Sequence, residues 1–145
     1  PDAAVDLDAG ALWIGLSGLL PPDDDRFRRT VDAVNQRLRV QLETPFSVTP
    51  GGSVKRYRFD DGLPGPEGGM IICSTWLIEC FVLLGRLDEA RSLFDAVCAM
   101  AGPTDLLAEQ WDDIEPGRGV ALGNFPQAYS HLGLINAAIR LFGNS

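Results

Sequence analysis

Among the 145 residues of this sequence, Glu109 is the one whose neighbours most favour acid–base chemistry. It lies in the stretch LLAEQWDD, residues 106–113, beside Leu106, Leu107 and Trp111 and within a predicted loop. A carboxylate held next to an indole in apolar surroundings can act as a general acid or a general base. A surface glutamate, or a glutamate that caps a loop, would fit the same pattern. We therefore keep both interpretations of Glu109.

A second candidate is the segment KRYRFDD, residues 55–61. Guanidinium, phenol and carboxylate groups alternate here, and together they suit a ligand rich in hydroxyl groups. Carboxylates accept hydrogen bonds from sugar hydroxyls, arginines donate to them, and aromatic faces stack on sugar rings. The candidate binding residues are Arg56, Tyr57, Asp60 and Asp61. The alternative is a loop that Arg–Asp pairs hold in place.

A third candidate is GNFPQAYSHLGLIN, residues 123–136. Asn124 fits the N-cap of a helix, because its side chain can accept a hydrogen bond from the first turn. Polar side chains follow in the first two turns: Gln127, Tyr129, Ser130 and His131. A lone histidine on a mostly apolar helix is typical of a structural residue with satisfied ring nitrogens, and this is our interpretation of His131.

Hydrophobic periodicity predicts five helices, at residues 8–20, 25–42, 69–84, 87–101 and 125–142, and no strand. Irregular segments are predicted at 43–68, with four prolines and five glycines, and at 103–124. The first, third and last helices are apolar on most sides, whereas the second and fourth are two-faced. We therefore predict an all-α fold in which inner and outer helices alternate, as in a double-layered ring of helical hairpins.

Charge and composition exclude several classes of function. The chain has 20 acidic and 12 basic residues and a net charge of −8, which disfavours binding to nucleic acid or to an anionic membrane. No apolar run approaches the roughly 20 residues that span a bilayer. One histidine and three dispersed cysteines do not form a zinc-ligand pattern, so no metal site is predicted.

The cysteines lie in apolar helical runs, at Cys73, Cys80 and Cys98. Their odd number does not suggest a disulfide framework. We predict three buried thiols and, by default, a reducing cytoplasmic location.

Three blocks of the sequence resemble glycoside hydrolase family 15, the group of glucoamylases and bacterial trehalases. They are residues 7–34, residues 56–95 from RYRFDDGLPGPEGG to RSLFD, and LLAEQWD followed by LGNFPQAYSHLGLINAA. The blocks occur in the order of the family and cover about residues 6–141. The resemblance implies an (α/α)6 toroid and an inverting, exo-acting α-glucosidase that needs no cofactor. It implies trehalose or another α-glucoside as the substrate.

The resemblance also implies roles for individual residues. Glu109, in Ala108-Glu109-Gln110-Trp111-Asp112, matches the general base of the family. Arg56 matches the arginine of a sugar-holding loop, and Asp60 or Asp61 matches its acidic residue. Tyr57 and Trp111 complete the predicted substrate-binding set, whereas Trp76 is expected to serve in packing only.

One departure from the family is clear, because no segment matches its general acid. Glu67 and Glu79 are not substitutes, since they match helix positions. We therefore expect residues 1–145 to be the C-terminal portion of a single catalytic domain whose N-terminal half is missing. Alone it should be inactive and expose the sides of the first, third and last helices. Two alternatives are a helical-hairpin interaction module, suggested by GRLDEARSLFDAV at 85–97, and a pseudoenzyme that binds sugar without cleaving it.

Overall fold

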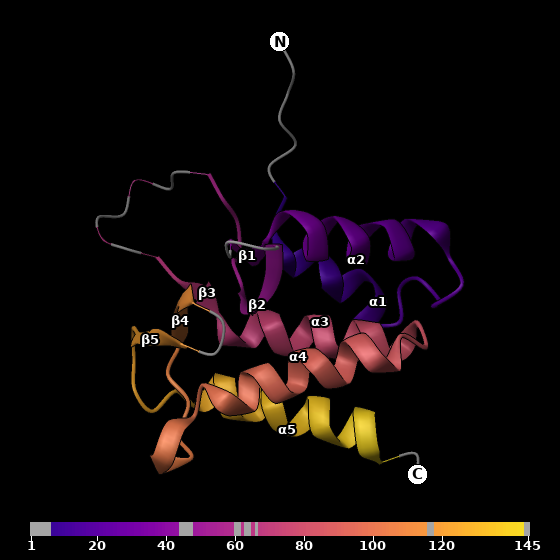
Figure 1. Ribbon diagram of the computed structural model, residues 1–145. Coiled ribbons are helices and arrows are strands. Elements are labelled where there is room, and N and C mark those ends of the chain that lie inside the picture. Colours follow the sequence, from indigo (N-terminus) through magenta and orange to yellow (C-terminus); the bar gives the residue numbers. More distant parts are fainter. Residues whose placement is uncertain are drawn as a thin grey trace.

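The computed structural model describes residues 7–43, 48–59, 62, 65, 67–115 and 118–143. Helices dominate these residues, and two small sheets lie at one end of them (Figure 1). The α-helices are α1 (Trp13–Leu16), which follows a 3-10 turn at Ala9–Leu12, α2 (Asp25–Arg37), α3 (Ile71–Leu83), α4 (Leu87–Ala99) and α5 (Ala128–Phe142).

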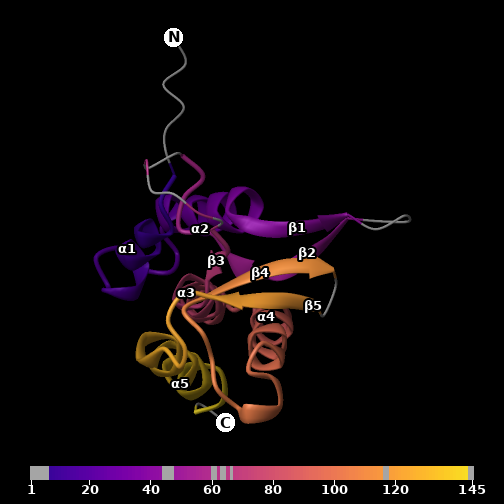
Figure 2. The same ribbon diagram turned by 90° about the vertical axis from the view of Figure 1, so that its left-hand side faces the viewer.

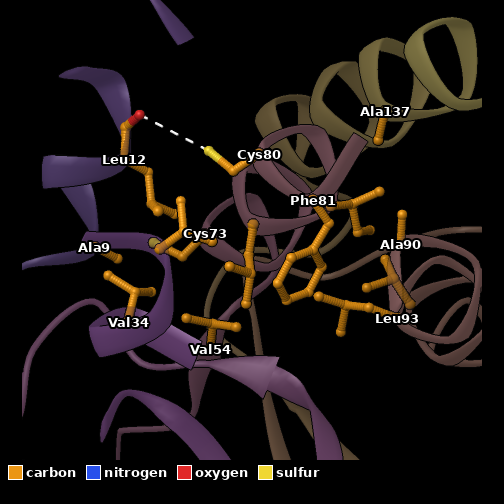
Figure 3. Close-up of a cluster of buried hydrophobic side chains, with 14 of the residues drawn as sticks. Ala9, Leu12, Val34, Val54, Cys73, Cys80, Phe81, Ala90, Leu93 and Ala137 are labelled. Atoms are coloured by element: carbon orange, nitrogen blue, oxygen red, sulfur yellow. Dashed lines mark hydrogen bonds between the residues drawn. The ribbon is translucent and has the colours of Figure 1, made fainter. Parts of the chain in front are cut away.

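Helix α3 is the centre of the fold. Its sequence, IICSTWLIECFVL, is apolar on nearly every side, and most of its residues are buried. It packs against α4 and α5 on one side and against α1 and α2 on the other (Figure 1). Figure 3 shows the resulting core, in which Cys73 and Phe81 of α3 meet Leu12, Val34, Val54 and Leu93 from four other segments. The predicted inner position of this helix is confirmed.

Helices α2 and α4 are two-faced, as predicted. Helix α2 buries Phe27, Val31 and Val34 at three- and four-residue spacing and leaves its arginines in water. Its N-terminus is capped by Asp24, whose side chain accepts a hydrogen bond from the Arg26 backbone N–H at 2.8 Å. The Arg26 guanidinium also donates to the Asp24 carboxylate, at 2.7 Å, and this side-chain hydrogen bond, followed by the backbone one, lowers the pKa of Asp24 to about 2.

The prediction of an all-α fold is wrong in part. Strands β1 (Arg39–Glu43) and β2 (Val48–Val54) form an antiparallel pair. Strands β3 (Gly69–Met70), β4 (Gln110–Glu115) and β5 (Arg118–Leu122) form a second, antiparallel sheet. The two sheets contact each other through β2 and β4 (Figure 2). The strands are rich in glycine and polar residues, so their local propensity is low. β1 pairs with β2 and β4 pairs with β5 across short connections, whereas β3 pairs with β4 about 40 residues away.

The ends of three helices differ from the predicted ones. The second helix ends at Arg37 because residues 39–43 pair with β2. The first predicted helix is shorter than 8–20, since the chain leaves α1 after Leu16. The last helix begins at Ala128, two residues after Pro126.

The three thiols do not share one environment. Cys73 and Cys80 are buried as predicted, and burial raises the pKa of Cys73 to about 12. The prediction for Cys98 is wrong, because this residue is exposed. It follows Val97 on α4, and one residue further along a helix turns a side chain by about 100° away from the buried stripe.

One side of α5 carries apolar side chains that are exposed within the described ranges: Tyr129, Leu132, Ile135 and Ile139. Phe142, at the end of this helix, is half exposed and packs edge to face against Phe94 of α4, with ring centroids 5.4 Å apart. Trp13 of α1 is also about half exposed. The expected exposure of the sides of the first and last helices is therefore observed. For the third helix the expectation is wrong, because no residue of α3 is exposed. No helix in the part of the chain that the structure describes is long and apolar enough to cross a membrane.

Candidate functional site

Two of the candidate residues, Glu109 and Arg56, meet at the end of the helical layer where α3 and α5 begin (Figure 1). Glu109 lies directly before β4 and is connected to both helices. Its carbonyl accepts a hydrogen bond at 3.1 Å from the backbone N–H of Ile71, the first residue of α3. Its own backbone N–H donates at 2.9 Å to the carbonyl of Asn124, in the segment that leads into α5. The main chain at Glu109 is thus fixed on two sides.

The first turns of α5 hold the segment that precedes Glu109. The Ser130 hydroxyl donates to the carbonyl of Ala108 at 2.7 Å, and Ser130 is almost fully buried. The backbone N–H of Leu107 donates to Nε2 of His131 at 3.2 Å, while Nδ1 of His131 contacts the carbonyl of Gln127 at 2.8 Å. Both ring nitrogens of His131 therefore have partners, and its predicted structural role is confirmed.

The carboxylate of Glu109 is held through one of its two oxygens. Oε2 accepts hydrogen bonds from the backbone N–H of Asn124 at 3.1 Å and from its side-chain Nδ2 at 2.8 Å. The predicted N-cap role of Asn124 is wrong, because Gln127 occupies the N-cap position of α5. The side chain of Asn124 binds Glu109 instead.

A cavity of about 330 Å³ opens beside Glu109. Its lining comes from four segments that are distant in sequence: Arg56, Met70, Ile72, Trp76, Glu109, Gln127, Tyr129 and Ser130. Glu109 is the only carboxylate among these lining residues, all of which lie in the described ranges. The cavity therefore combines one anionic group, one guanidinium, one amide and two aromatic side chains, which suits a neutral ligand with many hydroxyl groups.

Arg56 reaches this cavity from the loop after β2. Its Nε lies 3.3 Å from Oδ2 of Asp8, and its carbonyl accepts from the backbone N–H of Ala9 at 2.7 Å. Tyr57 is not among the lining residues, and its ring stacks on that of Phe59 with centroids 4.2 Å apart. The candidates Asp60 and Asp61 lie outside the described residues.

Trp111 also lies away from the cavity lining. It belongs to β4, where it pairs with Gly69 of β3 and Ala121 of β5. Its indole covers Gly119, where a β-carbon would collide with Nε1 of the ring. In the described structure Trp111 therefore packs within the three-stranded sheet.

Trp76, expected to serve in packing only, lines this cavity and also a larger hollow of about 730 Å³ beside it. Its ring meets that of Trp13 edge to face, with centroids 5.8 Å apart. The larger hollow runs along α1, α3 and α5 and contains Glu79, whose Oε2 accepts from Nε of Arg140 at 3.0 Å. Glu79 is thus buried and paired with a cation.

Sequence reasoning found part of this set. It named Glu109 and Arg56, and it noted Gln127, Tyr129 and Ser130 as polar residues in the first turns of a helix. It missed Trp76 and the contact between Asn124 and Glu109. The signal for Trp76 was its position one turn and a half after the start of α3, whose first residues face Glu109. Within the described ranges, no group of three or more metal-ligating side chains occurs.

No family model matches the chain. A trehalase of Mycobacterium tuberculosis is 44% identical over 138 residues, which cover 93% of this chain and 18% of that protein. A trehalase of Thermoplasma volcanium is 37% identical over 135 residues, covering 93% of this chain and 20% of its own length. The chain therefore spans about a fifth of the length of these curated relatives.

A solved structure described as a wild-type glycosidase is similar to the whole fold. It superposes with a TM-score of 0.74 at 24% identity and covers 96% of this chain and 37% of that chain. At this identity the similarity shows a shared fold.

Proposed function

We propose that this chain, which is homologous to one segment of the trehalases, is part of a glycoside hydrolase for α-glucosides and supplies its general base, Glu109. One observation carries the proposal. Glu109 and Arg56, which are 53 positions apart in sequence, line one cavity together with Gln127 and Tyr129. The trehalase relatives support α-glucosidic bonds as the target and trehalose as the first substrate to test.

Glu109 would act by activating water in an inverting reaction. The oxygen of the water bonds to the anomeric carbon while the bond between that carbon and the glycosidic oxygen breaks. One proton of the water passes to Glu109, and a carboxylic acid on the opposite side of the ring protonates the leaving oxygen. Inversion of configuration follows, because water enters from the face opposite to the leaving group.

We assign the acid to the part of the relatives' length that this chain does not span. In the described cavity Glu109 has no second carboxylate beside it. Glu79 is paired with Arg140, and Glu67 is exposed on the loop before β3. Neither lines the cavity, so neither is placed to donate a proton there.

The other lining residues would bind the sugar. Arg56 and Gln127 carry N–H donors for sugar hydroxyls, and the rings of Trp76 and Tyr129 offer flat apolar faces for a pyranose. Exo-action, with release of one glucose at a time, fits a cavity of about 330 Å³ that would hold little more than one ring.

The test uses the longest polypeptide of the source that contains this chain, purified and assayed on trehalose, maltose and the β-linked disaccharide cellobiose. We expect glucose from one or both α-linked sugars and none from cellobiose. With trehalose, proton NMR at early times should show equal amounts of β- and α-glucose before mutarotation, because only the attacked anomeric carbon inverts and the leaving glucose keeps its α configuration. Release of α-glucose alone from trehalose would contradict the inverting mechanism, and glucose release by the isolated 145-residue chain would contradict the missing acid.

A sugar-binding protein without hydrolysis is the second candidate. It is favoured by one specific observation, the single carboxylate in the cavity. Calorimetry with trehalose and maltose distinguishes the two candidates. Binding without any turnover by the long polypeptide would establish this second function instead of the first.

A further inference from the structure

The segment between β5 and α5 is built around the carboxylate of Glu109. Three hydrogen bonds join Glu109 and Asn124: Glu109 N–H to the Asn124 carbonyl at 2.9 Å, and the Asn124 N–H and Nδ2 to Oε2 of Glu109 at 3.1 and 2.8 Å. The two residues are 15 positions apart, and Asn124 is exposed. An exposed asparagine with all three contacts on one glutamate is an unusual use of a turn residue.

We propose that Asn124 is a positioning residue for the general base: it fixes Oε2 of Glu109 so that the other oxygen, Oε1, receives the proton of the attacking water. This proposal rests on the proposed function of Glu109. Among the described residues, the recorded donors to this carboxylate both come from Asn124 and both bind Oε2. Oε1 is thereby left as the oxygen that can accept from water in the cavity.

Asymmetric binding of this kind has a clear consequence for proton transfer. A carboxylate rotates about its last side-chain bond, because torsions of this type have broad minima. Two donors on one oxygen restrict the rotation and align a lone pair of the other oxygen with the cavity. Hydrogen bonds to an ionised acceptor are about twice as strong as neutral ones, so the restriction is substantial.

Gly123 provides the second, independent observation. Its φ is +73°, a left-handed conformation that favours glycine. A β-carbon at this position would lie 2.9 Å from Oε2 and 3.0 Å from the β-carbon of Glu109. The turn thus requires glycine both for its backbone conformation and for its close approach to the carboxylate. Gly123 and Asn124 therefore both lie against Oε2 of Glu109.

The test compares kinetics of the long polypeptide and its variants on the α-glucoside that it hydrolyses. Asn124→Ala removes the side-chain donor and keeps the backbone donor. Misplacement of a reacting group by about 1 Å can cost roughly 100-fold in rate. We expect kcat to fall about 10- to 100-fold, with KM within about threefold, because sugar binding does not use Asn124.

A double-mutant cycle separates positioning from a general structural effect. In a Glu109→Ala background the substitution Asn124→Ala should cause no further loss, since the group that it positions is gone. The matched control is Asn35→Ala on α2, away from the cavity lining, for which kcat should not change. Asn124→Asp keeps the size of the side chain but replaces the donor by an acceptor, and its kcat should fall at least as far.

The outcomes are distinct. Wild-type kcat in both Asn124 variants would overturn the positioning role and leave the proposed function intact. An equal loss in the presence and absence of Glu109 would also overturn it, because the effect would then be structural. A long polypeptide that hydrolyses no α-glucoside would refute the proposed function, and the positioning role would fall with it.

Discussion

The most direct perturbation is Glu109→Gln, which replaces the proposed base by an amide of the same shape. The structure determines how that amide would orient. Both donors of Asn124 point at the position of Oε2, so the glutamine oxygen should turn toward Asn124. Its NH2 group then faces the cavity, and this group can donate to water but cannot accept a proton from it.

The expected size of the effect follows from this geometry. Loss of a general base typically costs 100- to 10,000-fold in rate, which corresponds to about 2.7–5.4 kcal/mol of transition-state stabilisation. The two hydrogen bonds from Asn124 persist but lose their ionic component. Their weakening should lower the free energy of unfolding by only about 1 kcal/mol.

The assay measures initial rates of glucose release by the long polypeptide, with calorimetry for sugar binding and a thermal melt for stability. We expect a large fall in kcat, nearly unchanged sugar affinity and a small shift in Tm. Glu67→Gln is the matched control, since Glu67 is exposed and lies outside the cavity lining. A kcat within about threefold of wild type would refute the role of Glu109 as base.

Three further predictions concern the fold. The pKa of Asp24 is lowered to about 2 from 3.8. The stability that its carboxylate contributes is therefore present above pH 3.8 and is lost as the pH falls toward 2. Circular dichroism measured against pH should show a smaller loss of this kind in the Asp24→Asn variant. At Gly133, where α5 meets α3, a β-carbon would collide with Thr75 and lie 2.7 Å from Cδ1 of Ile72. Gly133→Val should therefore lower the free energy of unfolding in urea by about 1–3 kcal/mol, and an unchanged midpoint would contradict this packing. Ile139 is 65% exposed in this chain, yet Ile139→Ser should cost about 1.5–3 kcal/mol in the long polypeptide if its additional residues cover α5, and a neutral effect would argue against such cover.

The site could be predicted in part from sequence. Glu109 stood out because a carboxylate in an apolar loop is rare. The sequence blocks around it resemble glycoside hydrolase family 15, and the trehalase relatives confirm this resemblance. Asn124 was assigned to the wrong helix cap, because an asparagine before a helix has the same local pattern whether it caps the helix or binds another segment. Only the folded chain shows that its partner lies 15 residues earlier.

The helices could be predicted from the sequence, whereas the strands could not. The apolar pattern of α3 and the two-faced patterns of α2 and α4 were sufficient to predict them, because helical hydrogen bonds are local and the buried face follows a period of 3.6 residues. The strands were missed, since β1, β2, β4 and β5 are short and rich in polar residues and glycine, which gives no clear alternation. Strand β3 is two residues long and pairs with β4 across about 40 residues, a pairing that no local signal reports.

The sequence by itself determined which segments become helices and which faces of those helices are buried, and it singled out the glutamate that we propose as the base. Those properties depend on residue type and on spacing within one turn or a few. Tertiary structure alone decided that Arg56, Trp76, Glu109 and Gln127 share a cavity. It alone decided that Oε2 of Glu109 accepts two hydrogen bonds from Asn124. Such relations join side chains far apart in sequence, and their distances are fixed only when the helices and the two sheets pack together.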